Sequence, residues 1–214
     1  MTALDAGVRM DRMYRLQRHV YDLTRKYYLL GRDRLIQTLD AGPGERYVEV
    51  GCGTARNLVR AARRYPAARW YGVEPSAAML RTAGATLRRT GLEQRITLVH
   101  GDAVSFDPGP DCGLDRPPDG IWFSYALSMI PEWRAALDHA AALLPPGGTL
   151  HVVDFGDLAG LPPPFTRLLD GWLTRFEVTR RPEAIADHLR ALQGTLEATA
   201  LYRGYGLLLR FQKA

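Results

Sequence analysis

Short apolar segments bounded by glycine, proline and polar residues recur along the middle of this chain, and helix-like segments separate them. Five of the apolar segments have the length and the β-branched or aromatic content that predict strands. Strands that alternate with helices are joined by right-handed crossovers, which make a sheet mostly parallel and cover both of its faces. The alternation therefore predicts a doubly wound α/β domain, with strands at residues 47–50, 69–73, 96–99, 120–124 and 149–155.

Start and stop signals place the remaining elements. Ser76 is a predicted helix N-cap, and Gly91 lies just beyond the end of the same helix. Residues 107–118 are rich in proline and glycine and predict a loop. Residues 196–202 and 207–211 predict a closing hairpin, which brings the sheet to seven strands. Helices are predicted at residues 10–39, 55–65, 76–90, 131–144, 165–178 and 182–192.

The turn after the first predicted strand contains Glu49, Gly51 and Gly53. Glycine permits a tight turn and lets a ligand approach the backbone closely. A dinucleotide site uses Gly-x-Gly-x-x-Gly, but Arg56 stands where that pattern has its third glycine. A carboxylate beside the loop repels a pyrophosphate and suits a ligand that carries an ammonium group. The turn therefore argues against a nicotinamide-dependent dehydrogenase.

Acidic residues follow the second and third predicted strands. Glu74 ends the second strand, where a carboxylate can accept hydrogen bonds from both ribose hydroxyls of an adenosine. After the third strand, Asp102 can accept the exocyclic amine of adenine, and Ala103 offers a backbone N–H to the ring. Ligands of such sheets bind at the carboxyl ends of the strands, near the point where the strand order reverses. These residues therefore predict a nucleoside site.

The order of these motifs resembles that of the class I S-adenosylmethionine-dependent methyltransferases. Ala55 departs from the pattern, because many members have a third glycine there. The resemblance spans residues 45–155 and rests on Glu49-x-Gly51-x-Gly53, Glu74, Gly101-Asp102 and Pro145-Pro146-Gly147-Gly148.

The resemblance implies S-adenosylmethionine as methyl donor and S-adenosylhomocysteine as product. It places Glu49 near the methionine ammonium, Gly51 and Gly53 under the methionine, and Glu74 on the ribose. The predicted cofactor-binding residues are Tyr28, Arg32, Glu49, Gly51, Gly53, Asn57, Glu74, Pro75, Met79, Asp102, Ala103 and Ser124.

Residues 1–40 predict a helical lid or substrate segment, and residues 41–214 the methyltransferase domain. One face of the predicted lid is an apolar stripe, while arginines and tyrosines recur every seven residues on other faces. This pattern suits a capping helix with solvated charges, and it also suits a basic, aromatic face turned toward the substrate or an anionic bilayer. Residues 9–34 carry eight basic and three acidic side chains, which accounts for the net charge of +5.

Residues 10–33 and 124–130 also resemble one subfamily, the diacylglyceryl-homoserine N-methyltransferases of betaine-lipid synthesis. That resemblance implies successive methylation of the homoserine amine, with the lipid substrate at an anionic membrane surface. The amine must be neutral to react, and aromatic ring faces can stabilise the nitrogen once it is cationic. The predicted catalytic residues are Tyr28, His19 and Tyr125, and the predicted substrate-binding residues are Tyr14, Tyr21, Arg25 and Tyr125.

Other functions stay open or are disfavoured. The alternative is a methyltransferase of the same fold that acts on a small soluble acceptor, such as another amine or a quinone-type precursor. We expect no nucleic-acid partner, because no RNA-binding motif accompanies the basic residues, and no metal, because the histidines are scattered. Ser124 lacks the flanking glycines of a nucleophile elbow. Without a long apolar run, we expect a cytoplasmic protein attached peripherally to the inner face of the membrane, of open oligomeric state.

Overall fold

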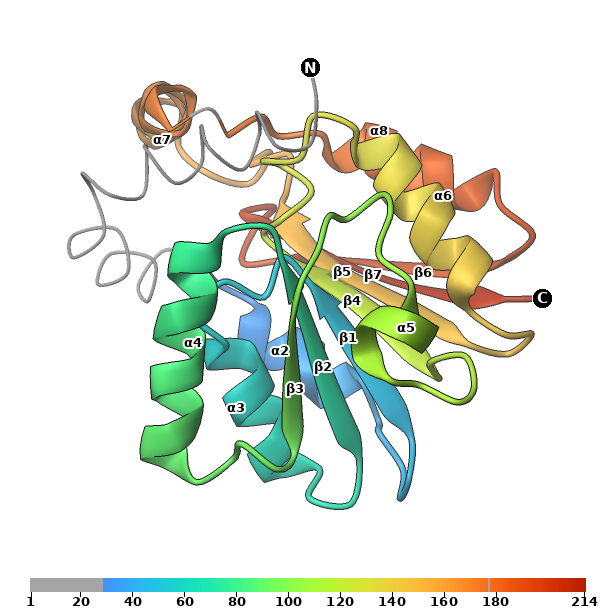
Figure 1. Cartoon of the computed structure of the whole chain (residues 1–214). Helices are drawn as coiled ribbons and strands as arrows, with labels where there is room; N and C mark the ends of the chain where they lie inside the picture. The colour runs from blue at the N-terminus through green and yellow to red at the C-terminus, as the bar shows by residue number, and fades with distance from the viewer. Residues whose placement is uncertain (1–28, 177) are drawn as a thin grey trace.

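The computed structural model describes residues 29–176 and 178–214, and these form an α/β domain around one sheet (Figure 1). The sheet has seven strands in the order β3-β2-β1-β4-β5-β7-β6, which confirms the predicted fold class. The strands are β1 (Arg46–Val50), β2 (Arg69–Glu74), β3 (Ile96–His100), β4 (Gly120–Ser124), β5 (Thr149–Phe155), β6 (Gly194–Leu201) and β7 (Gly206–Lys213).

Strand directions locate the part of the sheet where a ligand can bind. The strands β1 to β5 pair in parallel, and β7 runs antiparallel to both β5 and β6 as the predicted closing hairpin. From β1 the chain crosses outward to β2 and β3, and it then returns to the other side of β1 to form β4. The strand order therefore reverses between β1 and β4, and the carboxyl ends of these two strands border the switch point.

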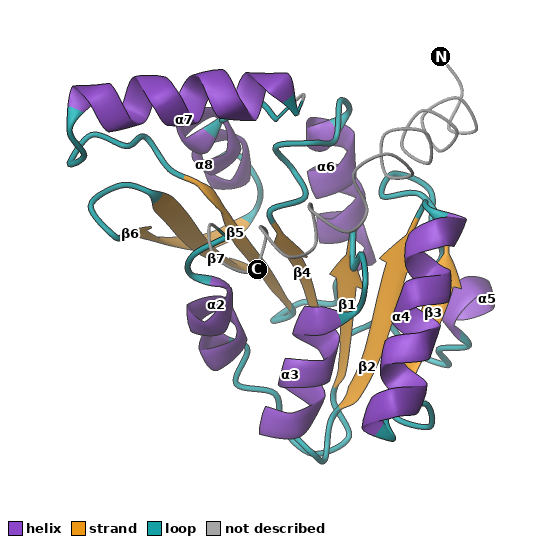
Figure 2. Cartoon of the chain, turned by 90° about the vertical axis from the view of Figure 1, so that its left-hand side faces the viewer, coloured by secondary structure: helices purple, strands orange, loops and turns teal. Residues whose placement is uncertain are grey.

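Helices cover both faces of the sheet. α3 and α4 pack on one face, and α5, α6 and α8 pack on the other (Figures 1 and 2). Each face has its own buried apolar cluster, so the central strands are buried on both sides, as a parallel sheet requires. The helices are α2 (Arg32–Thr38), α3 (Arg56–Arg64), α4 (Ala77–Thr90), α5 (Pro108–Cys112), α6 (Trp133–Leu143), α7 (Pro163–Arg175) and α8 (Pro182–Arg190).

Capping explains where several helices begin and end. α4 begins at the predicted N-cap, because the Ser76 hydroxyl accepts the Met79 N–H, and it ends at Gly91 in a left-handed conformation. The loop predicted at residues 107–118 is wrong in part, since it contains α5. The Asp107 side chain accepts the Gly109 N–H at the start of this short helix. A local cap therefore overrides a composition that disfavours helix.

Other helix bounds differ from the prediction by a few residues. Within residues 10–39, where one or two helices are predicted, α2 begins after Gly31, which has φ of +89°, and ends at Thr38. α6 begins at Trp133 instead of residue 131, and α7 ends at Arg175 instead of residue 178. The residue preceding α6, Glu132, has ψ of 40° and so lies outside the helical conformation.

Candidate functional site

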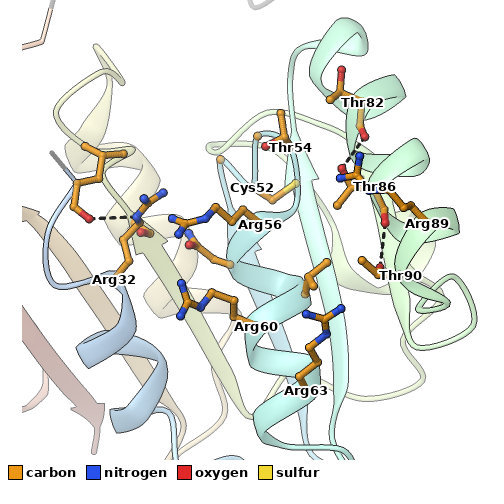
Figure 3. A pocket seen from close by; sticks show the side chains of 16 residues that line it. Arg32, Cys52, Thr54, Arg56, Arg60, Arg63, Thr82, Thr86, Arg89 and Thr90 are labelled. Atoms are coloured by element: carbon orange, nitrogen blue, oxygen red, sulfur yellow. Dashed lines mark hydrogen bonds between the residues drawn. The ribbon is translucent and has the colours of Figure 1, made fainter. Parts of the chain in front are cut away.

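A cavity of about 730 Å³ opens at the carboxyl ends of β1 and β4, where the strand order reverses (Figure 3). The loop from Gly51 to Thr54 and the start of α3 form its floor, and Ser124 at the end of β4 borders it. Leu29 and Arg32 approach from the segment around α2, and α4 forms the opposite wall. The cavity therefore includes the predicted glycine loop and Ser124, and it continues between α3 and α4, whereas Glu74, Asp102 and Ala103 are not among its lining residues.

The backbone conformation of the glycine loop disfavours residues that carry a side chain. Gly51 has φ of +76°, and a Cβ on it would lie 2.9 Å from the Cβ of Ala126. Gly53 has φ of +54°, and a Cβ there would meet no atom within 4 Å. The space over Gly53 is therefore open to a ligand. Ala55, the departure from the family pattern, has φ of +62° and so takes the left-handed conformation usual for glycine.

Glu49 lies buried directly behind this loop. Asn57, on the first turn of α3, donates a hydrogen bond from Nδ2 to Oε1 of Glu49 over 2.7 Å. Burial raises the pKa of Glu49 to about 8, because the carboxylate has lost its water. Asn57 itself lines the cavity and connects Glu49 to the cavity surface. A cation at that surface would favour the ionised carboxylate.

Glu74 holds the glycine loop to the end of β2. Its two carboxylate oxygens accept the backbone N–H groups of Gly53, at 2.9 Å, and Ser76, at 3.0 Å. Gly51 and Cys52 also donate from their backbone to the Val73 carbonyl. The predicted ribose-binding carboxylate is thus 5% exposed and lies directly next to the loop.

The remaining predicted nucleoside contacts follow β2 and β3. Pro75 is half-buried, and Met79 is buried on the first turn of α4. Asp102 accepts the Val104 N–H at 2.8 Å, and both Asp102 and Ala103 are half-buried. The register of β2 with β3 brings Glu74 opposite His100, two residues before Asp102. These residues therefore share one end of the sheet, as the sequence order predicts.

Three arginines point into the space between α2 and α3 beside the glycine loop (Figure 3). Arg32 comes from α2, and Arg56 and Arg60 come from successive turns of α3. Burial and the charge of Arg60 lower the pKa of Arg56. Asp33 pairs with Arg60 at 3.2 Å. The cluster is therefore a candidate anion site, of which only Arg32 was predicted, although Arg56 and Arg60 stand one helical turn apart in the sequence.

The predicted substrate residue Tyr125 lies in the core. It follows β4 with φ of +54°, is 2% exposed, and packs edge-on against Phe155. Its hydroxyl donates to the carbonyl of Leu30, and burial raises its pKa well above the usual value. Tyr125 thus ties the segment before α2 to the end of β4, and its contact with an acceptor stays a prediction.

The described residues contain no group of three or more His, Cys, Asp or Glu side chains that could hold a metal ion.

Several predicted residues lie outside the described part of the chain. The site is thus built from the predicted loop, acids and Ser124, with the arginines of α3 added. The predictions for Tyr14, His19, Tyr21, Arg25 and Tyr28 fall on residues that the structure does not describe.

The polar atoms at the cavity fit a donor that carries an ammonium, a carboxylate and ribose hydroxyls. Asn57 Oδ1 and Ser124 Oγ are buried and have no hydrogen-bond partner among the described residues, although both residues line the cavity. Buried polar atoms are costly unless a partner satisfies them. Together with the open space over Gly53, they match the polar groups of S-adenosylmethionine.

Comparisons with known proteins find methyltransferases. A family model described as a methyltransferase domain matches residues 48–148. A demethylmenaquinone methyltransferase of Corynebacterium glutamicum is 29% identical over 185 residues, which cover 80% of this chain and 73% of that protein. The methyltransferase GfsG of Streptomyces halstedii is 28% identical over 142 residues, which cover 66% of this chain but only 49% of that protein.

A solved structure shows the same fold. The S-adenosylmethionine-dependent methyltransferase SibL in its apo form superposes with a TM-score of 0.73 at 23% identity. The superposition covers 91% of this chain and 57% of that one, so this chain spans little more than half of SibL. Sheet order, glycine loop and the family match over residues 48–148 agree: the chain is similar to the class I S-adenosylmethionine-dependent methyltransferases and has their fold.

Proposed function

We propose that this chain transfers a methyl group from S-adenosylmethionine to a small acceptor that enters beside Ser124. The observation that carries the proposal is the continuous cavity, which joins the glycine loop after β1 to the end of β4. Donor and acceptor can therefore meet in one space, and holding two reactants together lowers the barrier of a bimolecular reaction. When bound, S-adenosylmethionine supplies a methyl group that its sulfonium already activates.

The chain's own residues bind and orient. Glu49, through Asn57, favours an ammonium group, and the Arg32 and Arg56 guanidiniums suit a carboxylate. Glu74 is the proposed ribose ligand, because its carboxylate ends β2 directly beside the loop that it holds. Asp102 and Ala103 remain the proposed adenine contacts.

For the acceptor, the comparisons favour a small molecule. The relative from Corynebacterium is a demethylmenaquinone methyltransferase, which supports a quinone-type precursor, and another amine remains within the same proposal. The arginines around the cavity favour a neutral or anionic acceptor over a cationic one. Methylation of nitrogen, oxygen or carbon is compatible with this arrangement.

A second candidate is the amine of diacylglyceryl-homoserine. The observation that favours it is the resemblance of residues 10–33 and 124–130 to the enzymes of betaine-lipid synthesis. The homoserine headgroup also carries a carboxylate, which the arginines suit. This candidate would place the chain at the inner face of a membrane, attached through its surface, with Tyr28, His19 and Tyr125 near the amine.

One experiment separates the candidates. The purified chain is incubated with methyl-labelled S-adenosylmethionine and, in parallel, with a quinone-type precursor, small amines, and diacylglyceryl-homoserine in detergent micelles. Mass spectrometry then identifies the labelled product. A labelled quinone or small amine supports the small-acceptor proposal, whereas a trimethylated homoserine lipid supports the second candidate. No labelled product with any acceptor would contradict both.

A further inference from the structure

Large apolar side chains reach the surface on three segments of the described chain. In the described residues, the exposed large hydrophobic side chains are two on α7, one before α2 and one in the turn between β6 and β7. Leu168 is 74% exposed, which is unusual for leucine on a folded surface. These four side chains, called the apolar edge below, are Leu30 (38% exposed), Phe165 (44%), Leu168 (74%) and Tyr202 (50%).

Backbone contacts join the segments of this edge. The loop before α7 is bonded to the β6–β7 turn, since Leu158 donates to the Gly204 carbonyl and Gly160 donates to the Arg203 carbonyl. On the other side of the turn, a Cβ added to Gly31 would lie 3.8 Å from the Tyr202 ring. The β6–β7 turn therefore lies between Gly31, which follows Leu30, and the loop that leads into α7. The turn and α7 can be followed in Figure 2.

The turn itself presents Tyr202 at a conformational cost. Tyr202 and Arg203 have φ of +52° and +61°, in a tight hairpin where asparagine and glycine are preferred. A tyrosine that is strained and half exposed contributes little to the core. Such outliers persist where the surrounding structure imposes them, and they suggest a use for the side chain they display. Tyrosine and arginine are also the side chains that suit the interface between lipid and water.

Charged side chains of both signs lie beside the apolar edge, and the carboxylate of Asp157 lies against the turn at Gly204. Arg167 on α7 and Arg203 in the turn are exposed, and neither has an ion-pair partner in the part of the chain that the structure describes. Asp170 on α7 is already engaged by Arg180. An anionic surface would complement these two arginines, whereas a neutral apolar partner would leave them unpaired.

The edge also lies at the functional end of the sheet. Gly206, just after the turn, pairs with Phe155 at the carboxyl end of β5, and β5 runs parallel to β4. The cavity opens at the carboxyl end of β4 beside Ser124. A surface that receives the apolar edge would therefore meet the same end of the molecule as the cavity.

We propose that the apolar edge, with Arg167 and Arg203, docks on an anionic phospholipid surface. Phe165, Leu168 and Tyr202 would enter the interfacial region while the two arginines pair with lipid phosphates. No helix in the described residues is long and apolar enough to cross a bilayer, so this contact would be made from the surface. The proposal goes beyond the methyl-transfer proposal and does not depend on it, because docking can be measured without an acceptor.

Vesicle flotation tests the proposal on the full chain. The vesicles are phosphatidylcholine with one quarter phosphatidylglycerol, compared with phosphatidylcholine alone, at low and high salt. We expect binding to the anionic vesicles that weakens with salt. Replacing both Phe165 and Leu168 with Gln should lower the bound fraction by about tenfold or more. Arg203→Gln should lower it by about fivefold at low salt.

Two variants separate docking from folding. Tyr202→Asn should weaken binding while keeping or raising the melting temperature, because asparagine tolerates the left-handed turn. Arg88→Gln, at an exposed arginine on the last turn of α4, is the matched control and should bind like the wild type. Calorimetry with S-adenosylmethionine checks that every variant keeps its donor site.

Three results would overturn the proposal. One is vesicle binding that the apolar-edge variants leave unchanged, which would assign any membrane contact to another surface. Another is an effect of these variants on self-association with no effect on vesicles, which would make the edge an interface between copies of the chain. Absence of wild-type binding to anionic vesicles at low salt would overturn it as well. None of these outcomes changes the interpretation of the methyl-transfer assay.

Discussion

The carboxylate of Glu74 accepts the backbone N–H of Gly53 over 2.9 Å, so the acid at the end of β2 fixes the loop at the end of β1. The same carboxylate is the proposed ribose ligand. One residue thus shapes the floor of the donor site and also takes part in binding. A substitution of Glu74 should lower the affinity for S-adenosylmethionine for two reasons. The loop would lose a hydrogen bond that holds it, and the ribose would lose a hydrogen-bond partner.

Glu74→Gln should therefore weaken S-adenosylmethionine binding by about 1–3 kcal/mol, the range for a lost hydrogen bond to a charged group. The NH2 group of the new glutamine side chain would also face a backbone N–H group, which needs an acceptor and not a second donor. Titration calorimetry measures the change. Glu93→Gln, at an exposed glutamate after α4, is the matched control and should bind the donor like the wild type. Equal affinity in both variants would remove Glu74 from the site.

Gly53→Ala should lower donor affinity by about tenfold or more, because a methyl group would occupy the open space over the loop. The matched control is Gly91→Ala at the end of α4, which also has positive φ and no atom within 4 Å of an added Cβ. Both variants should lose about 1–2 kcal/mol of stability through backbone strain. If Gly91→Ala weakened donor binding as much as Gly53→Ala, the effect would come from folding and not from the site.

Glu49 predicts how stability depends on pH. Its pKa rises from 4.5 to about 8 on folding, because the carboxyl is buried. Between these values the folded chain binds more protons at Glu49 than the unfolded chain, so this residue lowers stability as the pH rises. Glu49→Gln, which stays neutral, should melt progressively higher relative to the wild type from pH 5 to pH 8. Parallel melting curves across this range would show that Glu49 is ionised in the folded chain.

Donor binding should release a proton from Glu49. Below pH 8 the carboxyl is protonated in the free protein, and a bound ammonium group would favour its ionised form. Calorimetry at pH 6.5 in buffers of different ionisation enthalpy should therefore show close to one proton released by the wild type. Glu49→Gln should release none. Equal proton release by the two proteins would place the ammonium away from Glu49.

Much of the fold follows from local sequence signals. The predicted strands fall within β1 to β5 because each is a short apolar run between breakers, and α4 is bounded as predicted by Ser76 and Gly91. α5 was missed because its composition disfavours helix, and its start depends on a local cap in which Asp107 accepts the Gly109 N–H and donates its own N–H to Asp111. The sequence allowed one or two helices over residues 10–39, but it did not place the break at Gly31, because Gly31 packs against Leu201 of β6, which is distant in the sequence.

The candidate site, like the fold, could be predicted from the sequence only in part. The sequence could place Glu49, the two loop glycines, Glu74 and Ser124 at one end of the sheet, since each lies at or just after the carboxyl end of β1, β2 or β4. Their roles in binding stay predictions. The sequence could not predict that Arg32 lies near Arg56 and Arg60, because this depends on how α2 lies beside α3. The burial of Tyr125 depends likewise on Leu30 and Phe155, which are distant in the sequence.

Equilibrium binding of S-adenosylmethionine to the purified full chain tests the central claim most directly. We expect saturable binding at one site, competition by S-adenosylhomocysteine, and no competition by NADH, because Arg56 replaces the third glycine of a dinucleotide loop. Absence of saturable donor binding, or displacement of the donor by NADH, would contradict the claim that this cavity is a methyl-donor site.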